Sequence, residues 1–240
     1  NKVCGEPIKV DRAHLTDGYA QAIVVNSGNA NTCAANGVAL AEECCELVGK
    51  ALNIDAKDVL PSSTGVIGQP MVIDPFARGI PAAAAKLAAD AQGSADAATA
   101  IMTTEEYAIQ FELGGKICTV GAIGKGSGMI APNMATMLAF YTTDAAVSPA
   151  LLEKALKTVV PGTYNQMSVD LDTSTNDTLI IMASGLAGNP EITEENADYD
   201  AFVAALTAIA EHMCAEHAGD GEGATHLITC EVTHAPDLKT

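Results

Sequence analysis

The sequence contains no tryptophan and few aromatic residues of any kind, with five Tyr and four Phe in 240 residues. Apolar residues still make up 48% of the chain, so the protein can bury a substantial core. We therefore expect a core built from Ala, Val, Ile, Leu and Met. The length fits one large domain or two small ones.

Basic residues are also scarce, since 12 Lys and Arg stand against 30 Asp and Glu and leave a formal net charge of −18. Duplex DNA and anionic lipid headgroups would repel such a surface. We therefore expect neither nucleic acid nor a membrane surface as a partner.

Long apolar runs and a regular cysteine framework are missing as well. No run approaches the ~18 apolar residues of a membrane span, and residues 1–12 lack the apolar stretch of a secretory signal. The seven cysteines are odd in number and scattered, unlike a disulfide framework. We expect reduced thiols and a cytoplasmic protein. Because residues 1–12 resemble the interior of a fold, we also expect the chain to be a fragment.

Periodicity predicts strands and helices that alternate in an irregular order. Strands are expected over 22–25, 58–68, 97–106, 177–188 and 225–236, and helices over 37–52, 74–90, 148–160 and 198–223. The Gly114-Gly115 pair predicts a hairpin between two further short strands. This mixture favours a layered α/β (α+β) domain over a regular doubly wound sheet.

Two familiar site patterns do not match. A Walker loop around the glycines of 121–128 would need glycine at Thr119 and a hydroxyl residue at Gly126. His212 and Cys214 lie two residues apart on a predicted helix, so they point to different faces, and no acidic residue completes a zinc site. We expect neither a metal nor a bound cofactor.

Four loops combine glycine with hydroxyl or amide side chains, at 26–31, 62–65, 102–106 and 170–177. Turn chemistry alone explains each loop taken singly. Together they offer many hydroxyls and backbone amides but few charges, which suits a site that binds a small polar substrate and stabilises an oxyanion.

Six motifs occur in a fixed order along nearly the whole chain: NSGNAN (26–31), STGVIG (63–68), IMTT (101–104), KGSGMIAPNMATML (125–138), DTSTNDT (172–178) and DGEGAT (220–225). They resemble the ornithine acetyltransferase family of arginine biosynthesis, also called glutamate N-acetyltransferases. The resemblance implies a helix-sheet-sheet-helix sandwich of the self-processing N-terminal-nucleophile type. It also implies transfer of an acetyl group from acetylornithine to glutamate.

The same resemblance implies that the chain cleaves itself between Ala135 and Thr136. The new N-terminal Thr136 would be the nucleophile, with its own α-amine as base. Thr64 and Gly65 would form the oxyanion hole. The cleaved α and β chains would assemble as two copies of each, a heterotetramer.

Four residues match family positions that bind substrate: Thr103, Lys125, Thr136 and Glu222. The neighbouring Thr104 is an equal alternative to Thr103. Lys125 could pair with the substrate α-carboxylate. Glu222 could pair with the Thr136 amine or hold a proton for the leaving amine. Without the resemblance, Lys125 would be interpreted as a solvated loop lysine and Glu222 as an acidic residue in the turn at the end of a helix.

The chain also departs from the family. Family chains are longer at both ends, so we interpret 1–240 as a partial catalytic domain, with 146–219 as a candidate subdomain. His226 stands where the family has a lysine.

Two other functions stay open. The first is a self-processing aminopeptidase or amidohydrolase of similar fold, and the second is a non-enzymatic module that binds a small amino acid. No motif decides whether acetyl-CoA is a further acetyl donor.

The charge leads to a first prediction. Labelled duplex DNA titrated with the protein at physiological salt should show no change in fluorescence anisotropy, because the net charge of −18 opposes phosphate binding. A basic DNA-binding protein serves as the positive control. Saturable binding at micromolar protein would contradict the prediction.

Overall fold

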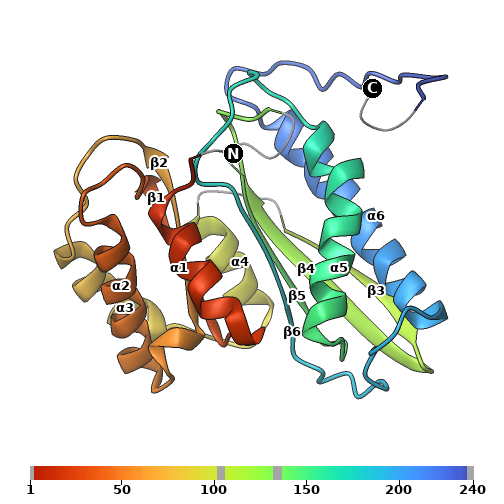
Figure 1. Ribbon diagram of the computed structural model, residues 1–240, viewed down its shortest axis with the longest axis horizontal. Helices are drawn as coiled ribbons and strands as arrows, with labels where there is room; N and C mark the ends of the chain where they lie inside the picture. The colour runs from red at the N-terminus through yellow and green to blue at the C-terminus, as the bar shows by residue number, and fades with distance from the viewer. Residues whose placement is uncertain (1–2, 102–105, 132–136, 237–240) are drawn as a thin grey trace. The chain divides into compact units, whose positions relative to one another are not determined.

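The computed structural model describes residues 3–101, 106–131 and 137–236. The chain forms two compact units. The first comprises Asn1–Thr104 with Thr175–Thr178, and the second comprises Glu105–Ser174 with Leu179–Thr240. Both combine helices with sheet, which confirms the α/β class (Figure 1). The candidate subdomain over 146–219 stays a prediction.

The first unit contains a two-stranded parallel sheet with helices around it. Its elements are β1 (Ala22–Asn29), β2 (Val59–Val66), α1 (Glu6–His14), α2 (Gly37–Leu52), α3 (Asp74–Ala84), α4 (Ala91–Ala100) and the short 3-10 helices η1 (Leu15–Asp17) and η2 (Ala56–Asp58). The crossover through α2 is the connection that parallel strands require. The register runs from Ala22 opposite Val59 to Asn29 opposite Val66, so two of the polar loops become the paired ends of neighbouring strands.

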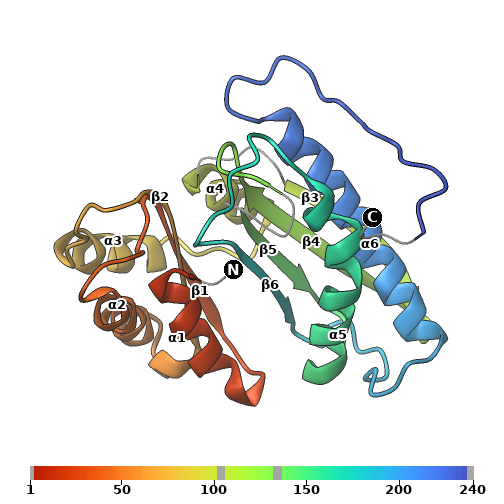
Figure 2. The same ribbon diagram turned by 45° about the horizontal axis from the view of Figure 1, so that its top comes forward.

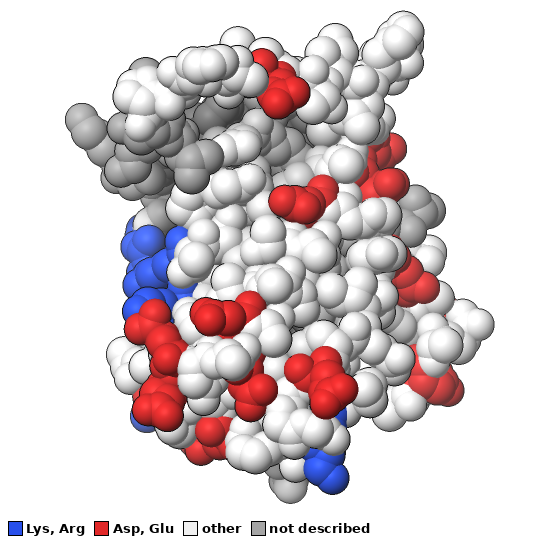
Figure 3. Space-filling model, turned by 90° about the vertical axis from the view of Figure 1, so that its right-hand side faces the viewer, with Lys and Arg blue, Asp and Glu red and all other residues white. Residues whose placement is uncertain are grey.

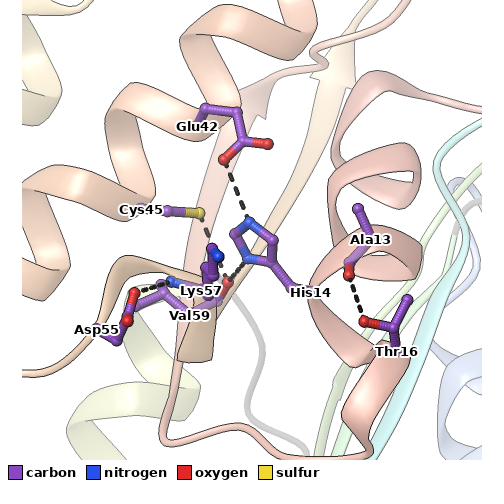
Figure 4. A network of polar contacts seen from close by, with 8 residues as sticks. All are labelled: Ala13, His14, Thr16, Glu42, Cys45, Asp55, Lys57 and Val59. Atoms are coloured by element: carbon purple, nitrogen blue, oxygen red, sulfur yellow. Dashed lines mark hydrogen bonds and ion pairs between the residues drawn. The ribbon is translucent and has the colours of Figure 1, made fainter.

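A histidine ties α1 to α2 and β2 within this unit (Figure 4). The Nδ1 of His14 donates to the carbonyl oxygen of Val59 at 2.8 Å, and its Nε2 lies 3.2 Å from a carboxylate oxygen of Glu42. The Cys45 thiol approaches the same carbonyl at 3.6 Å. The start of β2 is thereby held before the strand reaches its polar end.

The second unit contains a four-stranded sheet in the order β3-β4-β5-β6. Its elements are β3 (Glu106–Leu113), β4 (Lys116–Lys125), β5 (Leu138–Thr143), β6 (Thr178–Ala183), α5 (Pro149–Val159), α6 (Ala197–Gly219) and the short 3-10 helices η3 (Val160–Gly162) and η4 (Tyr164–Gln166). The two long helices α5 and α6 run side by side along the sheet (Figures 1 and 2). Buried aromatic residues of this unit, Tyr141, Tyr164, Tyr199 and Phe202, offset the shortage of aromatics in the chain as a whole.

Several predicted elements are confirmed. The helix over 37–52 is α2, and the hairpin turns at Gly114 and Gly115, whose φ angles are +53° and +74°. The helix predicted over 148–160 is α5, which follows Ser148 as its N-cap residue, although the Ser148 side chain makes no capping hydrogen bond.

Two predicted strands are wrong. Residues 97–100 of the segment predicted over 97–106 belong to α4 instead, because its alanines favour a helix and the Asp90 side chain caps the helix by accepting from Gly93 N at 2.8 Å. Residues 102–105 lie outside the described residues, and Glu106 begins β3. Residues 225–236 form no strand and are exposed. An isolated extended segment has no partner for its backbone groups, so apolar alternation alone does not make it a strand. The helix α1 and the strand β5 have no counterpart among the predicted elements.

The excess of acidic residues appears on the face drawn in Figure 3, where Asp and Glu are spread widely and Lys and Arg gather in small groups. Some of the few lysines are already paired, since Lys154 contacts Glu195 and Lys157 contacts Glu153. Among the described helices, none has the length and apolar character to cross a membrane.

Asp11 on α1 gives a prediction about stability. Its side chain is buried, its Oδ1 has no hydrogen-bond partner among the described residues, and burial raises its pKa from 3.8 to about 8. Between these values the unfolded chain is ionised at Asp11 while the folded chain keeps the proton. The free energy of unfolding should therefore fall as pH rises from 4 to 8, by up to ~1.4 kcal/mol per pH unit from this residue.

The variant Asp11→Asn removes this contribution. Urea denaturation at pH 4, 6 and 8 should show the variant gaining stability over the wild type as pH rises. Asp17→Asn, which removes an exposed carboxylate of η1, is the control. Parallel stability curves for Asp11→Asn and the wild type would refute the assignment.

Candidate functional site

Thr64 and Gly65 lie at the end of β2, where they pair with Ser27 and Gly28 of β1. Gly65 lies opposite Gly28, and both have positive φ angles, +126° and +122°. A Cβ atom on Gly65 would lie 2.3 Å from the carbonyl carbon of Gly28. Only glycine fits this approach. Thr64 is buried and Gly65 is exposed, so the pair places a buried hydroxyl residue beside an exposed glycine.

A buried polar network centred on Ser63, the residue before Thr64, supports this end of β2. The backbone N–H of Asn31 donates to Ser63 Oγ at 2.9 Å. The Nδ2 of Asn176 donates to Ser63 O at 3.0 Å and to Ser63 Oγ at 3.2 Å. Sequence reasoning placed both asparagines in polar loops but assigned them no role, because their contacts with Ser63 span 32 and 113 residues.

Lys125 and Glu222 lie in the second unit. Lys125 ends β4 and is paired with Leu138, the first residue of β5. The loop that follows Lys125 meets Glu222: the Glu222 N–H donates to Ser127 O, and a Cβ on Gly128 would lie 3.0 Å from Glu222 Oε2. The structure thus brings the Glu222 carboxylate against the glycine-rich loop.

Asp170 also contacts this loop and fixes the backbone after Gly128. Its carboxylate accepts from Met129 N at 2.6 Å and from Ile130 N at 3.0 Å, and Met129 has a φ of +57°. Burial opposes ionisation of Asp170, but backbone hydrogen bonds from Asp172, Met129 and Ile130 outweigh it and lower the pKa. Sequence reasoning missed this residue, although it belongs to the polar loop 170–177.

The glycine run also has a packing role. His217 of α6 is fully buried, and a Cβ on Gly124 would lie 2.4 Å from its Nε2. Burial lowers the pKa of His217 to about 4, so the ring is neutral at pH 7. The hydroxyls of Tyr141 and Tyr164 hydrogen-bond to each other beside it. Gly124 is therefore required for close packing of β4 on α6.

The remaining residues of the predicted site, Thr103, its alternative Thr104, Ala135 and Thr136, lie outside the described residues. Thr64 with Gly65 belongs to the first unit, and Lys125 with Glu222 to the second. His212 stacks on Tyr107 with ring centroids 3.8 Å apart. Within the described ranges, no cluster of three His, Cys, Asp or Glu side chains could hold a metal ion.

The chain is similar to known proteins over its whole length. The ArgJ family model matches residues 1–240. The arginine biosynthesis bifunctional protein ArgJ of Symbiobacterium thermophilum is 48% identical over 99% of this chain and 60% of its own length. The protein of the same name from Caldanaerobacter subterraneus subsp. tengcongensis is 45% identical over 98% of this chain and 59% of its own.

A crystal structure of the arginine biosynthesis bifunctional protein ArgJ from Bacillus halodurans is also similar, with a TM-score of 0.50 and 35% identity over 57% of this chain and 73% of that one. The fold and the ordered motifs are those of an arginine-biosynthesis enzyme family. The chain belongs to the ArgJ family. It spans about 60% of the length of the curated relatives it matches.

Gly65 in β2 and Gly68 in the loop that follows allow a matched test of the close approach. Gly68 also has a positive φ, +88°, but a Cβ there would meet nothing within 4 Å. Gly68→Ala should cost ~1–2 kcal/mol of unfolding free energy, the penalty of a left-handed backbone alone. Gly65→Ala should cost ~1–3 kcal/mol more, because its Cβ also collides with Gly28. Equal losses in guanidinium denaturation would contradict the close approach of the two strands.

Proposed function

We propose that the chain is the greater part of the catalytic domain of a glutamate N-acetyltransferase, which moves an acetyl group from N2-acetylornithine to glutamate. The observation that carries the proposal is membership of the ArgJ family over the whole chain, including the GMIAPNMATML motif. The relatives are named for arginine biosynthesis and for two functions. The activity is proposed for the full-length parent protein.

The first step is self-cleavage. The Thr136 hydroxyl attacks the Ala135 carbonyl carbon, the peptide C–N bond breaks, and its nitrogen takes a proton to become the Thr136 α-amine. The resulting ester between Ala135 and Thr136 Oγ is then hydrolysed by water, which releases the Ala135 carboxylate. A free α-amine has a pKa of ~7.7–8.0, so a substantial part is neutral near pH 7.5 and can act as a base.

Acetyl transfer then follows in two halves. Thr136 Oγ attacks the acetyl carbonyl of acetylornithine and gives its proton to the α-amine, and ornithine leaves with that proton. The amine of glutamate attacks the acetyl-threonine ester and regenerates the hydroxyl. Each half passes through a tetrahedral oxyanion, which Thr64 and Gly65 would stabilise at ~3–4 kcal/mol for each donor. The required glycine geometry at Gly65 supports this role.

The substrate would be held by few charges. Lys125 would pair with an α-carboxylate, Thr103 would contact the substrate, and Glu222 would pair with the Thr136 amine or keep a proton for the leaving amine. The contact of Glu222 with the loop after Lys125 supports a shared site. This donor set needs no metal.

Further features follow from the family resemblance. We propose a helix-sheet-sheet-helix sandwich of the N-terminal-nucleophile type for the complete fold, a heterotetramer of cleaved α and β chains, and a cytoplasmic location. Acetyl-CoA stays a candidate second donor. A self-processing hydrolase would share the nucleophile but pass the acyl group to water.

The nucleophile can be tested in the full-length parent. Wild type should run as two fragments, the second beginning Thr-Met-Leu-Ala-Phe. Thr136→Ala should abolish both cleavage and acetyl transfer, and Thr136→Ser should keep part of both, because it retains a hydroxyl. Brief exposure to acetylornithine without glutamate should add about 42 daltons to the fragment that begins at Thr136, as expected of an acetyl ester.

The outcomes are distinct. Release of acetate without transfer to glutamate would favour the hydrolase, and binding without turnover would favour a binding module. An adduct on another residue, or transfer by Thr136→Ala, would remove Thr136 as nucleophile.

A further inference from the structure

We propose that Asn176 is a positioning residue for the oxyanion hole, acting through Ser63 on the neighbouring Thr64 and Gly65. The inference rests on the proposed function and extends it to a side chain more than a hundred residues away in sequence. All four residues belong to the first unit. The argument starts from the hydrogen bonds that converge on Ser63.

The side-chain amide of Asn176 joins Ser63 to Thr175. Its Nδ2 donates to Ser63 O at 3.0 Å and to Ser63 Oγ at 3.2 Å, while its Oδ1 accepts from Thr175 Oγ1 at 2.7 Å. Asn176 and Ser63 are 4% and 3% exposed. Because Asn176 is nearly fully buried and its Nδ2 donates to Ser63, we assign it a supporting role and no direct contact with substrate.

The bond to Ser63 O acts directly on Thr64. That carbonyl belongs to the peptide bond whose nitrogen is the Thr64 N, and the peptide group is planar. Fixing the carbonyl therefore fixes the plane from which the Thr64 side chain and the Gly65 backbone continue. A hydrogen bond to a peptide carbonyl in a buried environment also polarises the whole amide.

The segment that carries Asn176 is held in place by the residues before α1. The backbone N–H of Gly5 donates to Thr175 O at 2.6 Å, and a Cβ on Gly5 would lie 2.6 Å from Asn176 Nδ2. The chain that leads into α1 thus packs directly against the Asn176 amide. Asn31 N completes the network by donating to Ser63 Oγ at 2.9 Å.

The network contacts the residue next to the proposed oxyanion donors, so its loss should change the rate of the chemical step. Oxyanion donors act on charge that develops in the transition state, so a misplaced donor lowers kcat and leaves KM nearly unchanged. A direct donor is worth ~10²–10³ in rate, so displacing one through its support should cost ~10–100-fold.

The experiment uses the full-length parent. Asn176→Asp keeps the shape of the side chain but replaces two N–H donors with acceptors that face the Ser63 carbonyl. We expect kcat for acetyl transfer to fall ~10–100-fold with KM unchanged, and self-cleavage to slow. Lowering the pH protonates the new carboxyl and restores one donor, so the ratio of variant to wild-type kcat should rise as pH falls.

Asn189→Asp is the matched structural control. Asn189 is also buried, and its Nδ2 donates to two carbonyls, Ala146 O at 3.2 Å and Pro190 O at 2.8 Å, in the second unit. It should lose comparable stability but keep kcat near wild type at every pH. If both variants lose kcat equally, the effect of Asn176 is general destabilisation and the proposal fails.

If Asn176→Asp does not fold, a second variant, Ser63→Ala, tests the proposal. Ser63→Ala removes the Oγ that accepts from both asparagines but leaves the Ser63 carbonyl bond. It should lower kcat by a smaller factor, again at unchanged KM. Wild-type kcat in a folded Asn176→Asp or, failing that, in Ser63→Ala would overturn the inference. Absence of acetyl transfer in the wild type would instead overturn the proposed function.

Discussion

The first unit depends on the parallel pairing of β1 with β2, and in particular on the approach of Gly28 to Gly65. The carbonyl carbon of Gly28 lies where a side chain on Gly65 would begin. This contact joins two separate polar loops into one surface, in which Thr64 is buried and Gly65 is exposed. His14 anchors the start of β2 through the Val59 carbonyl, and Asn176 with Asn31 anchors Ser63 near its end. The strand is thus held at both ends while Gly65 itself stays accessible.

The second unit uses the end of β4 in a similar way. Gly124 lets the buried ring of His217 pack against the strand, and Gly128 lets the Glu222 carboxylate reach the loop beyond it. Asp170 then fixes the left-handed turn at Met129. Gly124 and Gly128 therefore each allow a specific neighbouring group to approach the backbone, in addition to making the backbone more flexible.

Both units offer backbone amides and hydroxyl groups in preference to charges. That choice suits acyl transfer, in which negative charge appears briefly on a carbonyl oxygen and must be met by donors already in place. In the proposed reaction, Lys125 at the end of a paired strand would supply a cation for the carboxylate of an amino-acid substrate.

Local sequence was sufficient for the elements with strong periodicity or turn chemistry, such as α2 and the hairpin at Gly114-Gly115. The ordered motifs also supply the candidate residues Thr64, Gly65, Lys125 and Glu222, whose roles in a site stay predictions. Local sequence wrongly predicted strands over 97–106 and 225–236, where the apolar content suited a strand. The alanine run favoured a helix at the start of the first segment, and no neighbouring strand paired with the second. The roles of Asn176, Asp170 and His217 emerged only from the tertiary structure. Each acts on a residue 40 to 113 positions away or, for His217, on a glycine of another element, and no local pattern records which distant carbonyl or backbone a side chain will meet once the core has packed.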